Sequence, residues 1–238
     1  MPPHGLFLKR HISRVFNGLA VGQIVKLQEK TMSGSGDLKG KLLRWLTAER
    51  MIFSIFMENL HRVLALVAQK LPAAGIDCLL IGGFAVNHYG YTRNTLDVDF
   101  MIVSERVDDV RRIMCDAGFT NIEIRDNVAF FAIPNEAPRV DFLRVDASTM
   151  EKLLFSAVRV VVQGHELRLP SILDLISMKI FAFSQDTARR MGKDLPDIAY
   201  LSVIHNLDIE SDILPLCERF GTPETYRLIR NQIEGLRT

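Results

Sequence analysis

The segment IGGFAVNHYGYTRNTLDVDFMI, residues 81–102, joins a glycine pair to two aspartates and decides how the rest of the chain is interpreted. Asp97 and Asp99 alternate with apolar residues before the sequence becomes wholly apolar, a pattern typical of a β-strand. Successive side chains of a strand point to opposite faces, so we expect both carboxylates to lie on one face.

Two neighbouring carboxylates on one face of a strand repel each other, which raises the pKa of at least one unless a divalent cation neutralises them. Mg²⁺ suits such a position because it prefers oxygen ligands, usually takes one or two carboxylates, and completes its shell with water and substrate phosphate. Asp97 and Asp99 therefore predict a Mg²⁺ site, with Mn²⁺ as an alternative, and a phosphorylated ligand. The competing interpretation is an exposed strand whose acidic residues bind no metal ion.

The glycine pair supplies the second half of the predicted site. Residues 78–81 are typical of a short buried strand that leads into Gly82 and Gly83. Glycine has no Cβ, so phosphate oxygens can approach its amides closely, and the helix expected after the turn adds a favourable dipole. Arg93 offers a planar donor for a phosphate or an acidic neighbour, and Thr95 adds a hydroxyl.

The order of these features resembles the polymerase-beta superfamily of nucleotidyltransferases, over residues 60–205. Its members have a strand, a GG or GS turn, a short helix and D-x-D on the next strand, with a third carboxylate farther on. The resemblance implies an α/β (α+β) fold with a short mixed sheet flanked by helices and a C-terminal helical lobe. It also makes Gly82, Gly83, Arg93 and Thr95 nucleotide-binding residues.

Asp141, in the strand-like PRVDFLRV segment at residues 138–145, is the candidate for the third carboxylate. The resemblance implies that Asp97, Asp99 and Asp141 surround two cations about 3.5–4 Å apart, which orient an attacking hydroxyl in line with the α-phosphate. It further implies that Asp141 helps to deprotonate that hydroxyl. The alternative for Asp141 is a strand residue paired with a neighbouring arginine, Arg139 or Arg144.

Residues 174–201, DLISMKIFAFSQDTARRMGKDLPDIAYL, resemble a signature of the branch that contains abortive-infection and related toxin nucleotidyltransferases. This branch commonly has GG at the turn. The resemblance implies that Lys179 contacts the triphosphate and that Asp194 is needed for activity, while the arginine of the signature is Arg189 or Arg190. Lys179 alternatively packs its stem in an apolar helical stripe and extends its ammonium into water. Asp194 alternatively begins a helix, where the dipole favours acids.

Composition agrees with a globular enzyme, since the 238 residues carry a net charge of +1 and are 48% hydrophobic. Residues 1–50 contain nine Lys and Arg against three acids, which indicates a basic flexible arm or an extended start at residues 1–37. Three scattered cysteines predict neither a disulfide framework nor a zinc site and favour the cytoplasm. No apolar run reaches the roughly 20 residues of a membrane span.

The chain divides into the arm, a catalytic domain at residues 38–145, and a hairpin with a helical lobe at residues 146–238. We leave open whether the helix expected over residues 38–71 is broken. The other predicted elements are strands at 77–82, 96–103, 120–124, 127–133 and 138–144, helices at 105–117 and 148–156, a hairpin that turns at Gly164, a Lys179 helix after Pro170, and helices over 193–236 separated near Asn206 and at 221–223.

The leading hypothesis is a metal-dependent nucleotidyltransferase that moves an NMP from an NTP to a hydroxyl and releases pyrophosphate. The toxin-like resemblance suggests RNA such as tRNA, or a protein, as acceptor, and an antitoxin protein as partner. One alternative is a nucleotide-binding regulatory module without turnover. The other is a modifier of small molecules, like the antibiotic nucleotidyltransferases.

Overall fold

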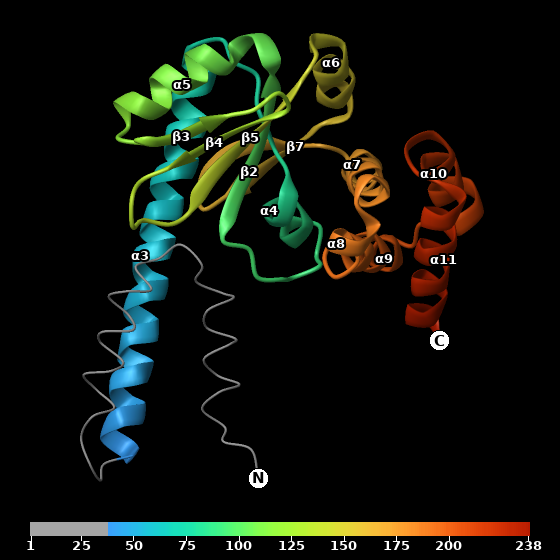
Figure 1. The fold of residues 1–238 in the computed structure, drawn as a ribbon, viewed down its shortest axis with the longest axis horizontal. Coiled ribbons are helices and arrows are strands. Elements are labelled where there is room, and N and C mark those ends of the chain that lie inside the picture. The colour runs from blue at the N-terminus through green and yellow to red at the C-terminus, as the bar shows by residue number, and fades with distance from the viewer. Residues whose placement is uncertain (1–37) are drawn as a thin grey trace.

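The computed structural model describes the backbone of residues 38–238, and side chains at Thr47, Arg50, Met51 and from Phe53 onward. Its centre is a mixed five-stranded sheet in the order β1-β2-β5-β4-β3, in which only β2 and β5 run parallel (Figure 1). The strands are β1 Leu79–Leu80, β2 Asp97–Val103, β3 Asn121–Ile124, β4 Val128–Ala132 and β5 Arg139–Val145, with β6 Val158–Val162 and β7 His165–Leu169 forming a separate hairpin.

Helices flank the sheet and make up the C-terminal third of the chain. In Figure 1 the long helix α3 runs out on one side of the sheet, and α7–α11 gather on the other. The helices are α3 Leu38–Ala73, α4 Gly82–His88, η1 Ser104–Arg106, α5 Val107–Asp116, α6 Ala147–Ser156, α7 Ile172–Gln185, α8 Thr187–Arg190, α9 Asp194–Ile204, η2 Ile209–Ile213, α10 Leu214–Phe220 and α11 Pro223–Arg237. The predicted fold class, a short mixed sheet flanked by helices with a C-terminal helical lobe, is confirmed.

The alternation in β2 places apolar and acidic side chains on different faces, as its sequence predicts. Val98, Phe100 and Ile102 are fully buried in the main core. Met101 points the other way, into a second cluster with Leu79 and side chains of α6. Burial on both faces fixes the register of the strand and therefore the direction in which its carboxylates point.

Most predicted elements are confirmed to within a few residues, and one differs. The helix expected over 38–71 is confirmed and is continuous from Leu38 to Ala73. The strand expected over 77–82 contains only Leu79 and Leu80, because Gly82 adopts φ +63° and α4 begins there. The chain thus turns into α4 directly from the strand beside β2.

The helical lobe begins and ends its helices where the sequence indicates. Ser171 caps α7 and Thr222 caps α11, each by accepting a backbone N–H three residues on. Asn206 has φ +53°, which ends α9, and the break at 221–223 separates α10 from α11. The π-helical turn η2 was not predicted, because its residues carry no distinct sequence signal.

One core cluster draws side chains from α3, the sheet and the helical lobe, including Leu64, Phe142, Ile176, Ile198 and Ile233. The division at 145/146 stays a prediction, and the arm predicted at 1–37 lies outside the described residues. Across residues 38–238, no helix is both long enough and apolar enough to cross a membrane.

Candidate active site

The three predicted carboxylates come together on the two parallel strands. In the register of β2 and β5, Asp99 is the partner of Asp141 and Asp97 is the partner of Arg139. Partners in a parallel pair share a face of the sheet. The two acids of β2 and the single acid of β5 therefore form one row, as the sequence predicts.

The glycine turn packs directly against this row. A Cβ at Gly82 would lie 2.5 Å from Cγ of Asp99 and would overlap its Oδ2, while a Cβ at Gly83 would lie 2.5 Å from Oγ1 of Thr95. The amide of Gly83 also donates a hydrogen bond to the Asp99 carboxylate. Because no other residue type fits at either position, the turn can bring bare backbone amides up to the acids.

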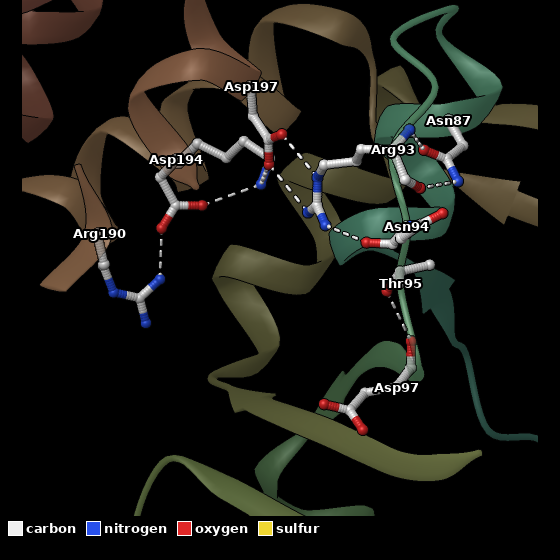
Figure 2. Close-up of polar contacts among 9 residues, drawn as sticks. Asn87, Arg93, Asn94, Thr95, Asp97, Arg190, Asp194 and Asp197 are labelled. Carbon is white, nitrogen blue, oxygen red and sulfur yellow. Dashed lines mark hydrogen bonds and ion pairs between the residues drawn. The ribbon is translucent and has the colours of Figure 1, made fainter. Parts of the chain in front are cut away.

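The loop between α4 and β2 is held by its own polar groups. Asn87 donates from Nδ2 to the carbonyl of Arg93 at 3.0 Å and accepts from the Arg93 amide at 2.9 Å (Figure 2). Thr95 donates from Oγ1 to the carbonyl of Asp97 at 3.2 Å. These bonds hold Arg93 against α4 and fix Thr95, whose side chain lies against Gly83.

Repulsion within the row is visible in its electrostatics. Burial raises the pKa of Asp99, and Asp97 adds to the shift, while Lys193 and Lys179 oppose it. Burial likewise raises the pKa of Asp141 to about 6, against the influence of Arg139. The carboxylates therefore need positive charge to stay ionised together.

Arg139 supplies such charge in this structure. Its guanidinium binds Asp141 through Nε at 2.7 Å and Nη2 at 2.6 Å, and Nη2 lies 3.2 Å from Asp97. The predicted alternative of an arginine pair for Asp141 is thus present alongside the row. Among the described side chains, no three His, Cys, Asp or Glu are arranged to hold a metal ion.

A second constellation lies in the helical lobe. Lys179 of α7 binds Asp194 at 3.1 Å and Asp197 at 2.6 Å, and its side chain is only 7% exposed. Arg93 forms a bidentate pair with Asp197 at 2.7 and 3.0 Å, and Arg190 binds Asp194 at 2.6 Å (Figure 2). The sequence predicted Lys179 and Asp194 as functional residues, and the structure joins them.

We refer to these five residues, Arg93, Lys179, Arg190, Asp194 and Asp197, as the ion network. Its three cations exceed its two carboxylates by one charge. Burial alone would raise the pKa of Asp194, but Lys179 and Arg190 outweigh it and hold that pKa below its usual range. The ammonium of Lys179 does not extend into water, so the snorkelling alternative is wrong.

The family model described as "Nucleotidyl transferase AbiEii toxin, Type IV TA system" matches residues 65–234, which contain the acid row, the glycine turn and the ion network. The chain belongs to the AbiEii family. It is therefore a nucleotidyltransferase of the polymerase-beta-like superfamily. No curated protein matches the sequence.

Solved structures with similarity to this AbiEii family member include three nucleotidyltransferases or related proteins. An antigenic nucleotidyltransferase-like protein from Paracoccidioides brasiliensis matches 73% of this chain and 93% of its own, at 19% identity and TM-score 0.46. ANT(2")-Ia in complex with adenylyl-2"-tobramycin matches 75% and 99%, at 15% identity and TM-score 0.49. The lincosamide antibiotic adenylyltransferase LnuA matches 58% and 93%, at 14% identity and TM-score 0.43.

Asp197 is the residue of this AbiEii site that the sequence did not single out. Its side chain is fully buried and joins Arg93, which follows the glycine turn, to Lys179 of α7. Asp197 lies in the first turn of α9, where the helix dipole alone accounts for an acidic residue without a partner. Asp194 and Asp197 are three residues apart and therefore lie on one face of the helix. This spacing was the sequence signal that both acids contact the same lysine.

The two candidate arginines of the signature separate in the AbiEii structure. Arg190 turns inward to Asp194, while Arg189 lines an open pocket next to Arg139. Adjacent helix residues point about 100° apart, so both arginines cannot serve one contact. The structure therefore assigns Arg190 to the ion network and leaves Arg189 to a different surface.

Proposed function

We propose that the chain transfers a nucleoside monophosphate from an NTP to a hydroxyl group and releases pyrophosphate. One observation carries the proposal: the register that sets Asp99 beside Asp141, against a glycine turn in which only backbone fits. The amides of the turn can donate to phosphate oxygens of the NTP. The acids lie next to the turn, where we propose that the α-phosphate binds.

In this proposal Asp97, Asp99 and Asp141 hold Mg²⁺ or Mn²⁺. Their fit rests on the raised pKa values of Asp99 and Asp141 and on the guanidinium of Arg139, which stands where a cation is needed. A bound cation supplies a Lewis acid that polarises the phosphoryl group and offsets the charge of the phosphate oxygens. In the proposal Asp141 accepts the proton of the attacking hydroxyl.

The ion network provides the positive charge for the triphosphate. Lys179 of the network lowers the pKa of Asp99, as does Lys193 outside the network, so positive charge from the lobe acts on the acid row. Asp194 and Asp197 hold the ammonium of Lys179 in place, and Asp197 also orients Arg93. A fixed cation loses little conformational entropy when it binds a phosphate, which makes the network a preorganised triphosphate site.

The family description supports an antitoxin protein as partner, because it names a type IV toxin–antitoxin component. As acceptor of the NMP we propose RNA such as tRNA, or a protein. Cys78, Cys115 and Cys217 are all free thiols, which supports a reducing cytoplasm as the compartment.

The experiment incubates the protein with each α-labelled NTP, Mg²⁺ or Mn²⁺, and total RNA or cell protein. We expect label on a macromolecule, and a loss of about 10²-fold or more with Asp97→Asn and Asp99→Asn. Asp116→Asn is the matched control, because Asp116 is an exposed acid on α5, away from the row. It should transfer label like the unmodified protein.

Three results would point elsewhere. NTP binding without transfer to any acceptor selects a regulatory module. Label on a small aminoglycoside-like compound, and on no macromolecule, selects a modifier of small molecules. Transfer that survives both aspartate substitutions contradicts the proposed site altogether.

A further inference from the structure

The loop between α4 and β2 lies against the helical lobe. It leaves α4 at Tyr89 and enters β2 at Asp97, so it connects the glycine turn to the acid row. Gly90 has φ +100°, and a Cβ added there would lie 3.5 Å from Cγ2 of Ile204 on α9. The backbone of the loop therefore passes close to α9.

Three alternate residues of the loop each contact a residue of α9 or of its C-cap. Alternate side chains of an extended segment point to one side, and helix residues three apart share a face. We call these three contacts the α9 clasp. They pair Tyr89 with His205, Tyr91 with Tyr200, and Arg93 with Asp197.

The Tyr89 end of the clasp is fixed by polar groups as well as by its ring. The rings of Tyr89 and His205 meet edge to face, with their centroids 5.5 Å apart. Nε2 of His205 donates to the Tyr89 carbonyl at 2.9 Å, and the Tyr89 hydroxyl donates to the carbonyl of Pro170 at 2.6 Å. Since Pro170 directly precedes the cap of α7, this end of the loop is tied to both α7 and α9.

The centre of the clasp is a stack of two tyrosine rings. The centroids of Tyr91 and Tyr200 lie 4.3 Å apart, and the ring planes differ by 9°. Burial raises the pKa of Tyr91, and Asp197 and Tyr200 add to the shift, which agrees with a ring beside the Arg93–Asp197 pair. Among the described residues neither tyrosine hydroxyl takes part in a hydrogen bond, so the rings themselves hold the stack.

The third contact of the clasp reaches the ion network. The Asp197 carboxylate binds Nε of Arg93 through Oδ1 at 2.7 Å (Figure 2). Its Oδ2 binds Nζ of Lys179 at 2.6 Å, and the whole side chain is fully buried. Tyr200 follows Asp197 by about one helical turn. A shift of α9 against the loop would therefore change where the ammonium of Lys179 stands relative to the glycine turn.

We infer that Tyr91 and Tyr200 are positioning residues of the nucleotide site: their stack holds Asp197, and through it the ammonium of Lys179, at a fixed place relative to the glycine turn. The inference rests on the proposed function and adds to it two residues outside the acid row and the ion network. An ammonium that is already in place loses less conformational entropy when the triphosphate binds. Loss of the stack should therefore weaken NTP binding, which a purely fold-stabilising role would not do.

The test uses the full chain with Mg²⁺ and the α,β-methylene analogue of each ribonucleoside triphosphate, and measures Kd by isothermal titration. Tyr91→Leu and Tyr200→Leu should each raise Kd about tenfold, while label transfer at saturating NTP should fall less than about threefold. Tyr91→Phe and Tyr200→Phe keep the rings and should bind the analogue like the unmodified chain.

Tyr226→Leu is the matched control for lost stability. Tyr226 of α11 is partly buried against the core, and its hydroxyl contacts Glu210 within the lobe. This substitution should lower the unfolding temperature of the chain but leave Kd unchanged. An equal rise in Kd for Tyr226→Leu, or no rise for Tyr91→Leu and Tyr200→Leu, would overturn the inference.

Hydrogen exchange at the Arg93 amide separates this inference from the proposed function. That amide donates to Oδ1 of Asn87 at 2.9 Å, so its protection reports whether the loop keeps its place. Without nucleotide, Tyr200→Leu should speed this exchange about tenfold, and Tyr226→Leu should not. Unchanged exchange in Tyr200→Leu would overturn the clasp even if NTP binds. Faster exchange in a chain whose unmodified form binds no analogue would overturn the proposed function while supporting the clasp.

Discussion

Gly82 is the residue on which the proposed site depends most directly. It combines a left-handed φ of +63° with a position where a Cβ would overlap Oδ2 of Asp99. Gly82→Ala must therefore displace Asp99 or the turn. We expect NMP transfer to fall by about 10²-fold, because a shift near 1 Å in a reacting group costs that much.

Gly75→Ala is the matched control for this substitution. Gly75 has φ +65° and nothing within 4 Å of an added Cβ. Both variants should lose about 1–2 kcal/mol of unfolding free energy from the left-handed backbone, measured by urea denaturation. Only Gly82→Ala should lose transfer, and equal losses of transfer in both variants would show that the overlap with Asp99 is irrelevant.

Arg139 competes with any cation for the acids of the row. Its guanidinium is bidentate on Asp141 and also contacts Asp97, so a metal ion has to displace it. We expect Arg139→Gln to bind Mn²⁺ about tenfold more tightly without nucleotide, which corresponds to 1.4 kcal/mol. Isothermal titration with Mn²⁺ measures this directly.

The control for Mn²⁺ binding is Arg125→Gln, because Arg125 pairs with Glu123 and not with the row. It should leave the Mn²⁺ affinity unchanged. Weaker Mn²⁺ binding by Arg139→Gln would mean that the guanidinium orients the carboxylates for the metal ion instead of competing with it.

At the scale of elements, the first turn of α9 brings Asp194 and Asp197 to Lys179 of α7. Asp194 is 4% exposed in its side chain, and its pKa is held below the usual range by Lys179 and Arg190. Asp194→Asn should lower the unfolding free energy near neutral pH by on the order of 3 kcal/mol, because it unbalances a buried ion pair. The comparison is made by urea denaturation.

The pH dependence of this loss follows from the direction of the shift. A depressed carboxyl pKa stabilises the folded state above the unfolded value near 3.9, and the contribution disappears as pH falls through the folded value. The difference between the unmodified chain and Asp194→Asn should be constant from pH 5 to 8 and shrink below about pH 4. Asp109→Asn, which removes partly exposed pairs with Arg106 and Arg112, should show a much smaller difference throughout.

Elements with a strong local pattern could be predicted from the sequence. The alternation around Asp97 and Asp99 located β2, and the turn residue Gly164 located the β6–β7 hairpin. The bounds of the short β1, and the turn η2, could not be predicted, because contacts across the sheet and within the lobe set them. Local pattern likewise identified the acidic residues of the candidate site, but not the arginine that forms an ion pair with each.

The same limit applies to the site. Asp97, Asp99 and the glycine turn follow from spacing within one segment. Asp141, Lys179 and Asp194 followed from a resemblance. The Arg93–Asp197 pair joins residues 104 positions apart, and no local spacing encodes such a contact. Sequence therefore predicted the candidate residues, while the tertiary fold decided their partners.

At the scale of the whole molecule, sheet and helical lobe share one core. Leu64 of α3, Phe100 of β2 and Ile233 of α11 belong to a single buried cluster. Ile233 is fully buried at the far end of the lobe. Because the cluster is continuous, we expect the sheet and the lobe to unfold together, although the sequence suggests a boundary at 145/146.

Ile233→Ala tests this expectation. It should cost about 2–5 kcal/mol, as large-to-small substitutions in a core do. Native-state hydrogen exchange should show the same loss of protection at the amides of β2 and β5 as at those of α7 and α9. Ile204→Ala, at a side chain in the lobe that is 44% exposed, should change both by less than about 0.5 kcal/mol. Loss of protection confined to α9–α11 would instead show that the lobe is an independent folding unit. The ion network would then be the contact between two domains that form the nucleotide site only when they dock.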